Sequence, residues 1–326
     1  MKKSALGTLG TLGRTLACFA LALGGCGTEA SVNMDEGGLT GGTGGTQAGT
    51  GGALSGTGGG STAVNGGGGA MAGTGGMGPI AGAMGGTGGV AEVEPPPDCE
   101  RGVTTASSVL LIGDSYIDLN LKAFGTELER LAREEGSLPE GQKYVDRSVS
   151  GSQMAGVSLL GLIPDQYAFE NNSDGHIKTV VMDGGGNDVL VGNRSCIDNQ
   201  APPQNASCVD TLDGVLSTLA DLYAQMAADG VENVVYFFYP HLPGGGLGGN
   251  KELTNQTIDY AIDREGSDNA VTVCDNAPLN CVFVDTRGLF PAEAVEFQDG
   301  IHPTVANTQK ISGSVWQAMK AGCIAQ

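Results

Sequence analysis

The sequence has little positive charge and few aromatic residues. Lysine and arginine together number 16, against 36 aspartates and glutamates, and aromatic residues make up 5% of the 326 positions. A chain this acidic offers no basic surface for nucleic acid, and an anionic lipid surface would repel it. The composition therefore excludes a nucleic-acid-binding protein and suits an extracytoplasmic surface.

Histidines and closely paired cysteines are scarce as well. The sequence contains only His176, His241 and His302, and no Cys-x-x-Cys spacing occurs. A structural zinc site takes four cysteine or histidine ligands at short, paired spacings. We therefore expect no metal.

Charge is absent altogether from residues 37–91. Glycine occupies 26 of positions 37–90, and threonine, alanine and serine fill most of the others. Such a segment buries too little apolar surface to offset the entropy of ordering it, so residues 26–97 are predicted to be a disordered tether. Its r.m.s. reach from Cys26 to about Cys99 would be roughly 45 Å.

The first 25 residues resemble a secretory signal of the bacterial lipoprotein type. Lys2, Lys3 and Arg14 flank a short apolar run at 16–23, and a Leu-Gly-Gly-Cys sequence ends at Cys26. A lipobox would place a lipid on Cys26, whereas the alternative is an ordinary signal peptide cut near the same point. Maturation would leave 13 lysines and arginines against 36 acidic residues, a net charge near −23.

Residues 98–326 remain for one domain, which is long enough to bury a full core. Six cysteines fall in it, and an even number in an exported chain predicts three disulfides out of 15 possible connectivities. Spacing suggests two local pairs and one that joins the ends of the domain: Cys196–Cys208, Cys274–Cys281 and Cys99–Cys323.

Apolar runs that alternate with helical periodicity indicate a parallel sheet. We expect strands at 107–112, 144–149, 177–182, 231–239 and 281–285, and helices at 117–135, 212–226 and 305–321, with a weaker one at 154–162. The predicted fold is a doubly wound, flavodoxin-like three-layer α/β sandwich with a mainly parallel five-stranded sheet.

Two loops at one edge of this sheet carry residues suited to nucleophilic chemistry. Ser115 directly follows the first strand, and a serine hydroxyl needs a base, usually a histidine oriented by a carboxylate. Asp299 and His302 lie in one loop after the last strand and can supply both. His241, at the same edge, is the competing base, while His176 precedes its strand and is interpreted as a solvated residue.

Donors for an oxyanion occur in neighbouring loops. The backbone N–H groups of Ser115 and Gly151 and the side-chain amide of Asn187 follow the first, second and third strands. Asp114 and Asp188 are interpreted as turn-stabilising residues that accept backbone hydrogen bonds rather than as a catalytic carboxylate pair.

Taken in order, these segments resemble the SGNH (GDSL-type) hydrolase family. The blocks are Gly113-Asp114-Ser115, Ser150-Gly151, Gly185-Gly186-Asn187-Asp188 and Asp299-Gly300-Ile301-His302-Pro303. The resemblance implies that Ser115 is the nucleophile, His302 the base and Asp299 its orienter. It also implies an oxyanion hole of Ser115, Gly151 and Asn187, and no metal or organic cofactor. Two departures are Tyr116, where the family often has leucine, and the missing asparagine upstream of Gly151.

The sequence thus predicts an extracytoplasmic serine esterase that cleaves O-acyl esters through an acyl-enzyme. We expect a monomer that meets the membrane only through its N-terminal lipid and acts on acetylated glycans or short-chain lipid-like esters. Thioesterase or lysophospholipase activity in the same fold is one alternative. A catalytically silent cell-surface carbohydrate-binding module is another, and an adhesive role for the glycine-rich segment is a third.

Overall fold

The computed structural model describes Cys99, residues 104–290 and residues 297–325. The predicted signal segment 1–25, Cys26 and the tether 26–97 lie outside these described residues. None of the helices within the described ranges is both long and apolar enough to cross a membrane.

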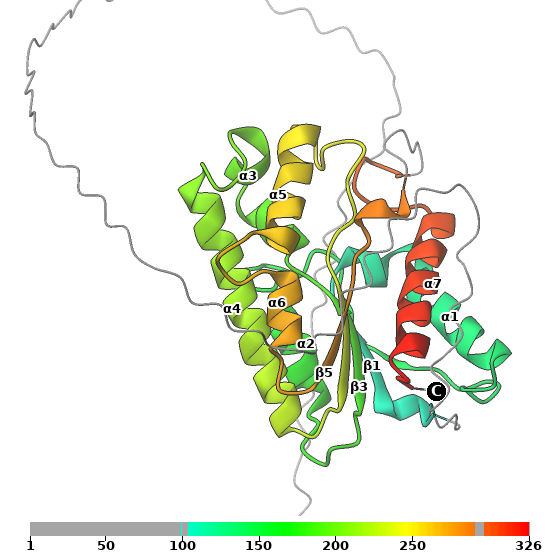
Figure 1. The fold of residues 1–326 in the computed structure, drawn as a ribbon. Coiled ribbons are helices and arrows are strands. Elements are labelled where there is room, and N and C mark those ends of the chain that lie inside the picture. The colour runs from blue at the N-terminus through cyan, green and yellow to red at the C-terminus, as the bar shows by residue number, and fades with distance from the viewer. Residues whose placement is uncertain (1–98, 100–103, 291–296, 326) are drawn as a thin grey trace, which may run out of the picture. The chain divides into compact units, whose positions relative to one another are not determined.

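A five-stranded sheet forms the centre of the described domain (Figure 1). Its strands are β1 Val109–Ile112, β2 Val145–Asp146, β3 Thr179–Asp183, β4 Asn233–Phe237 and β5 Asn280–Val284. They lie in the order β2-β1-β3-β4-β5, and every neighbouring pair is parallel. Strands β1 and β3 are buried along their whole length, as is typical of a parallel sheet covered on both faces.

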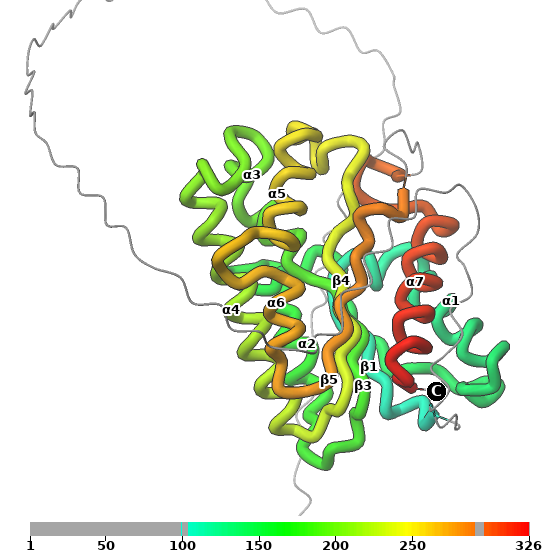
Figure 2. The backbone as a smooth tube through the Cα atoms, viewed as in Figure 1, coloured from blue at the N-terminus to red at the C-terminus, as the bar shows by residue number. Residues whose placement is uncertain are grey.

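Helices cover the two faces of the sheet. They are α1 Ser115–Glu134, α2 Ile163–Glu170, α3 Ser195–Asp198, α4 Ala206–Ala228, α5 Lys251–Asp263, α6 Ala270–Asp275 and α7 Val305–Ala321, with short turns η1 Ala106–Ser108, η2 Asp188–Gly192 and η3 Arg287–Leu289. Helices α1 and α7 pack together on one side, and α2, α4, α5 and α6 lie on the other (Figures 1 and 2). The predicted doubly wound three-layer architecture is therefore confirmed.

The strand order reverses at β1, since β2 lies on one side of it and β3 on the other. Ligands of open α/β sheets bind at the carboxyl ends of strands beside such a reversal. The loops meet there as expected: Val149 N–H donates to Gly113 O at 3.0 Å, and Asn187 Nδ2 donates to Ser152 O at 3.1 Å.

The weak helix predicted at 154–162 was wrong. This segment forms a loop in which Gly156 and Gly161 have φ of 80° and 94°, and the helix begins only at Ile163, where Pro164 occupies its first turn. Two further helices, α5 and α6, lie in a stretch for which the sequence analysis predicted no element. Helix α7, by contrast, matches the predicted range 305–321.

Helix α1 contains a left-handed turn five residues after it begins. Asn120, Leu121 and Lys122 have φ between 56° and 61°, a conformation that costs a non-glycine residue about 1–2 kcal/mol. Side chains on either side of Leu121 anchor the turn: Asn120 Nδ2 donates to Pro303 O at 2.9 Å, and Lys122 Nζ donates to Asp146 Oδ1 at 3.0 Å. Tertiary contacts thus hold a backbone that the local sequence would not choose.

The substitution Leu121→Gly is expected to stabilise the domain. The Leu121 side chain is 98% exposed, so its loss removes little packing, whereas glycine adopts the left-handed conformation without penalty. We expect a gain of about 1 kcal/mol and a rise in Tm of about 2–4 °C in thermal unfolding. Leu121→Ala is the matched control and should change Tm little, because alanine keeps the penalty; an equal rise with alanine would contradict this explanation.

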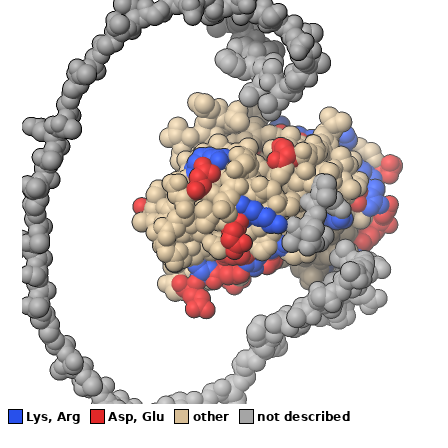
Figure 3. All heavy atoms as spheres, turned by 90° about the horizontal axis from the view of Figure 1, so that it is seen from above, with Lys and Arg blue, Asp and Glu red and all other residues tan. Residues whose placement is uncertain are grey.

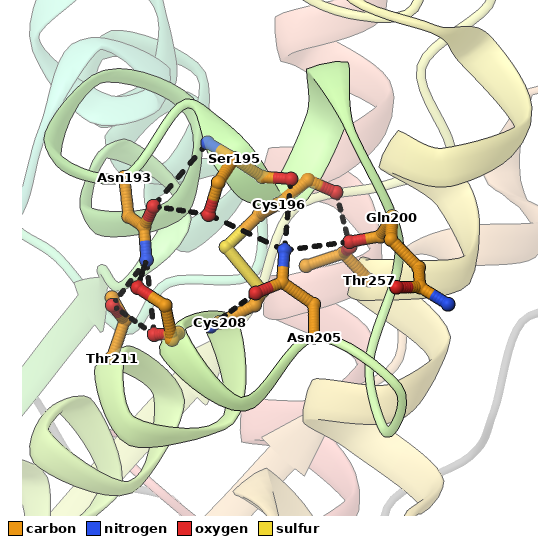
Figure 4. The surroundings of a disulfide bond; sticks show 9 residues. Asn193, Ser195, Cys196, Gln200, Asn205, Cys208, Thr211 and Thr257 are labelled. Carbon is orange, nitrogen blue, oxygen red and sulfur yellow. Dashed lines mark hydrogen bonds between the residues drawn. A yellow bond between two sulfur atoms is a disulfide. The ribbon is translucent and has the colours of Figure 1, made fainter. Parts of the chain in front are cut away.

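Three disulfides join the six cysteines of the domain: Cys99–Cys323, Cys196–Cys208 and Cys274–Cys281. They are the same pairs that the spacing suggested. The Cys196–Cys208 bond closes the insertion between β3 and α4 (Figure 4). Around it, Asn205 Nδ2 donates to Ser195 O at 2.9 Å, and Thr257 Oγ1 donates from α5 to Cys196 O at 3.1 Å.

Candidate active site

Ser115 is presented at the carboxyl end of β1 as the first residue of α1. Gly113 makes the sharp turn between the two with a φ of 145°, and a Cβ at this position would lie 1.7 Å from Asp183 Oδ1, so only glycine fits. Asp114 caps the helix by accepting a hydrogen bond from Tyr116 N at 3.1 Å. The Ser115 N–H belongs to the first helical turn, whose amides have no partner within the helix.

His302 lies between Ser115 and Asp299. Its Nε2 is 3.1 Å from Ser115 Oγ, and its Nδ1 is 2.6 Å from Asp299 Oδ2. The other Asp299 oxygen accepts from the backbone N–H of His302 at 2.8 Å and of Ile301 at 3.1 Å, which fixes the carboxylate within its own loop. The structure therefore brings together the three residues that the sequence analysis selected from opposite ends of the domain.

The Asp299 carboxyl is held in its charged form. Partial burial opposes this charge, but the hydrogen bonds from His302 N–H, the His302 ring and Ile301 N–H outweigh it and lower the pKa of Asp299 below its usual value. A carboxylate that stays ionised beside Nδ1 directs the Nδ1 proton toward itself and leaves Nε2 free to accept a proton from Ser115.

Tyr116 ties helix α1 to the loop that carries His302. Its hydroxyl donates to Ile301 O at 2.8 Å, next to His302, and its ring packs against Tyr239 with the ring centroids 4.3 Å apart. A leucine at this position could not make the hydrogen bond. In the sequence, Tyr116 stands out only as a departure from the family pattern, because nothing local indicates its partner nearly two hundred residues away.

The loop that carries Gly151 is fastened on both sides of that residue. Ser150 N–H donates to Asp118 Oδ2 at 2.9 Å, on the first turns of α1, and Ser152 O accepts from Asn187 Nδ2 at 3.1 Å. Gly151 has a φ of 83°. The three predicted oxyanion donors therefore belong to one hydrogen-bonded cluster around the start of α1.

Asn187 uses its amide to join neighbouring loops. Besides Ser152 O, it donates to Asp114 Oδ2 at 3.2 Å. Both of its N–H bonds thus have protein acceptors, and one of them would have to turn to a substrate oxygen for Asn187 to act as a donor there. Its role stays a prediction.

Asp188 stabilises a turn, as predicted. Its carboxyl accepts from Met154 N and Ala155 N, each at 2.8 Å, and burial raises its pKa to about 7 despite these hydrogen bonds. It lies beside a cavity of about 300 Å³. The lining consists of Gln153, Ala155, Gly156, Val157, Asp188, Gly192, Asp210, Thr211 and Gly214. Two of these residues, Gly192 and Asp210, lie on either side of the segment that contains Cys196 and Cys208.

A second buried carboxyl, Asp183, lies beneath Asp114. Asp183 Oδ1 accepts from Asp114 N at 2.7 Å, while Asp183 Oδ2 is buried and has no hydrogen-bond partner among the described residues. Both carboxyl oxygens of Asp114, by contrast, accept hydrogen bonds, including one from Tyr239 OH to Oδ2 at 2.7 Å. Burial, followed by the nearby charge of Asp114, raises the pKa of Asp183 well above its usual value. Nothing in the sequence singles out Asp183, which directly follows the strand predicted at 177–182.

Asp183→Asn is expected to reduce the loss of folding stability that occurs as pH rises above about 4. A carboxyl whose folded pKa is raised stabilises the fold fully below its unfolded pKa near 3.9, and this contribution is lost as pH rises through the folded pKa, by up to about 1.4 kcal/mol per pH unit. Urea unfolding from pH 4 to 9 should therefore show a smaller decline in the variant. Parallel profiles would contradict a protonated Asp183.

The other histidines lie apart from Ser115. His241 Nε2 is 2.8 Å from Asp259 Oδ1, and Asp259 also accepts from Arg287 Nη1 at 3.1 Å, so this pair belongs to a surface ion network. His176 pairs with Asp174 just before β3, at the amino end of the sheet. Of the three, it is His302 that contacts the serine. No group of His, Cys, Asp and Glu side chains in the described parts of the chain has the geometry of a metal site.

Comparisons with known proteins find a likeness in structure alone. No protein-family model and no curated sequence matches the chain. Similar solved structures include the lipase Lip_vut3 from a goat rumen metagenome (13% identity, 67% of this chain and 99% of that chain, TM-score 0.49). Others are a carbohydrate acetylesterase family member from Sinorhizobium meliloti (14%, 66% and 95%, 0.43) and an inhibitor-bound aryl esterase from M. smegmatis (15%, 65% and 97%, 0.43). At these identities and TM-scores the likeness carries no argument about activity, which has to be inferred from the geometry of this chain.

Proposed function

We propose that this protein is a serine esterase of the SGNH type that hydrolyses O-acyl esters. The observation that carries the proposal is the chain of contacts from Asp299 Oδ2 to His302 Nδ1, at 2.6 Å, and from His302 Nε2 to Ser115 Oγ, at 3.1 Å. Both distances lie within the reach that a base needs to take a proton from a nucleophile. The ordered sequence blocks around Ser115, Gly151, Asn187 and His302 support the same conclusion.

Acylation follows from this arrangement. Ser115 Oγ attacks the ester carbonyl carbon while His302 Nε2 takes the hydroxyl proton, and the Asp299 carboxylate stabilises the imidazolium that forms. Collapse of the tetrahedral intermediate breaks the bond to the alcohol oxygen, and His302 returns its proton to that oxygen. The alcohol leaves and the acyl group remains on Ser115.

Deacylation repeats these steps with water. His302 takes a proton from the attacking water, and the acyl group leaves as a carboxylic acid when Ser115 Oγ recovers its proton. The oxyanion formed in both halves would be held by the N–H groups of Ser115 and Gly151 and by the Asn187 amide. Loss of one such donor costs about 10²–10³ in kcat in enzymes of this kind.

The three disulfides support an oxidising compartment, since disulfides are rare in the reducing cytosol. We place the enzyme outside the cytoplasm, held to the cell envelope by a lipid on Cys26 and the glycine-rich tether. When the full chain is expressed in a bacterium, Cys26→Ser should move it from the membrane pellet to the soluble fraction without changing its turnover. Retention of the variant in the pellet would contradict the lipid anchor.

The activity is tested with p-nitrophenyl esters and acyl thioesters offered to the full chain. The proposal expects hydrolysis of the oxygen esters in a burst followed by steady turnover, because acyl-enzyme accumulates when deacylation is slower. Turnover of thioesters alone would favour the alternative activity in the same fold. No turnover of any ester, together with glycan binding, would favour a silent carbohydrate-binding module.

A further inference from the structure

We propose that the loop from Gln153 to Leu162 is the acyl-chain subsite, and that the substrate is an ester with a medium-length aliphatic acyl group rather than an acetate. This inference rests on the proposed ester hydrolysis at Ser115. It assigns to the loop a role in choosing between the two substrate classes that the sequence leaves open.

The loop is apolar and exposed. The side chains of Val157, Leu159 and Leu160 are 95%, 103% and 59% exposed. No acidic or basic residue occurs between Arg147 and Asp165, although the whole chain carries 52 such residues. Figure 3 looks down on the end of the sheet where α7 begins, and much of the surface there belongs to uncharged residues. Single exposed apolar side chains are ordinary, but three on one uncharged loop beside a reactive serine indicate a contact surface.

The loop is fixed against the predicted oxyanion site. Its base is closed by hydrogen bonds from Gln153 N to Gly161 O at 3.4 Å and from Ile163 N to Gln153 O at 2.9 Å. Next to this base, Leu160 Cδ1 lies 2.3 Å from the place where a Cβ on Gly151 would be. Leu160 therefore packs against Gly151, the residue whose N–H is proposed to hold the carbonyl oxygen of the acyl group.

The other side of the same loop faces the cavity of about 300 Å³. The loop lines it with Gln153, Ala155, Gly156 and Val157, and the rest of the lining is Asp188, Gly192, Asp210, Thr211 and Gly214. The Asp188 carboxyl at this cavity is already satisfied by two backbone amides, so it does not require a polar ligand. The loop therefore contributes apolar side chains both at Gly151 and at a cavity, lined in part by polar side chains, whose volume lies at the lower end of those that hold small ligands.

The test is the chain-length dependence of kcat/KM. Each methylene that an acyl chain buries is worth up to about fourfold, so the full chain should hydrolyse p-nitrophenyl hexanoate at least about 30-fold better than the acetate. Leu160→Ser and Val157→Ser should each lower kcat/KM for the hexanoate about 5- to 10-fold and leave the acetate within twofold. Phe169→Ser is the matched control, because Phe169 is 75% exposed on α2, and it should leave both unchanged.

The outcomes separate the subsite from the activity. If the active enzyme prefers acetate, or if kcat/KM does not depend on chain length, the proposed subsite is wrong but the esterase activity stands. The same holds if the loop variants lose equal shares of kcat/KM on acetate and hexanoate. Faster release of acetate from an acetylated glycan than of hexanoate from its p-nitrophenyl ester would also overturn it. Failure to hydrolyse any ester would contradict both the proposed esterase activity and the proposed subsite.

A separate observation assigns a positioning role to Asn120. From the left-handed turn of α1 its Nδ2 donates to Pro303 O at 2.9 Å and to Thr308 Oγ1 at 3.2 Å, and its Oδ1 accepts from Gln298 Nε2 at 2.8 Å. Gln298 and Pro303 flank the segment that contains Asp299 and His302. Asn120 lies five residues after Ser115, so it fixes the distance between the serine helix and the histidine loop.

Because this turn is left-handed, a glycine substitution can test the positioning role of Asn120 separately from any effect on folding stability. Asn120→Gly removes the side chain and places in the turn a residue that adopts the left-handed conformation without strain, so the domain should unfold at a similar temperature while kcat falls about 10- to 100-fold and KM changes little. Leu121→Gly relieves the same kind of strain without touching the loop and should keep kcat. A kcat within twofold of the native value in Asn120→Gly would overturn the positioning role.

Discussion

Ser115→Ala is expected to lower kcat for ester hydrolysis by about 10⁶-fold, to the residual rate that binding and oxyanion donors alone provide. The reason is chemical: without Oγ no acyl-enzyme forms, and His302 can only assist a direct attack by water. Folding should be unaffected, since the Ser115 side chain is small and its described contact is to His302. The comparison requires the burst amplitude as well as the steady rate, because the burst reports the acyl-enzyme itself.

Ser108→Ala is the matched control for this substitution. Ser108 immediately precedes β1, so it flanks the opposite end of the strand that leads to Ser115, and its hydroxyl bonds only locally, to Thr105 O at 2.7 Å. Its turnover should equal that of the native chain, and circular dichroism and Tm should agree among all three proteins. A Ser115→Ala variant that kept its burst would show that another residue carries the acyl group.

His302→Ala should cost nearly as much as the loss of the serine, about 10⁶-fold in kcat. The serine hydroxyl has no other described base, and Asp299 cannot reach it except through the imidazole. Because the residues act as a unit, the double variant Ser115→Ala with His302→Ala should be no slower than either single variant.

His241→Ala distinguishes this dyad from the second histidine–carboxylate pair at the same edge of the sheet. His241 contacts Asp259 at 2.8 Å, much as His302 contacts Asp299, but its partners are the ion network of Arg287. Turnover within about threefold of native is therefore expected. A loss in His241→Ala comparable to that in His302→Ala would mean that the wrong histidine had been assigned.

The sheet could be predicted because its strands are short apolar runs that end in glycine or polar residues. Val109–Ile112 and Thr179–Asp183 have no competing helical pattern, and Val305–Ala321 has a clear one. The prediction of a helix at 154–162, by contrast, was wrong. The apolar residues of this segment are spaced as in a helix, but its glycines take positive φ values, and Val157, Leu159 and Leu160 face solvent. Periodicity alone cannot show whether an apolar residue is buried.

The candidate catalytic residues could be chosen from the sequence because the proposed chemistry needs particular residue types at the ends of strands. Ser115, Asp299 and His302 were selected in this way, and the structure places them in contact. The residues that hold these three in position could not be found from the sequence. Asn120 acts through a left-handed backbone and Tyr116 through a hydrogen bond to Ile301 O, and both depend on contacts that form only once the chain has folded.

The nucleophile is tested most directly by covalent labelling with diisopropyl fluorophosphate, in which a serine oxygen displaces fluoride from phosphorus. We expect one diisopropylphosphoryl group per full-length chain, located by peptide mass spectrometry on Ser115, with hydrolysis lost in proportion to labelling and no label in Ser115→Ala. Label on a different residue, or full ester hydrolysis by a chain labelled at Ser115, would contradict the proposed mechanism.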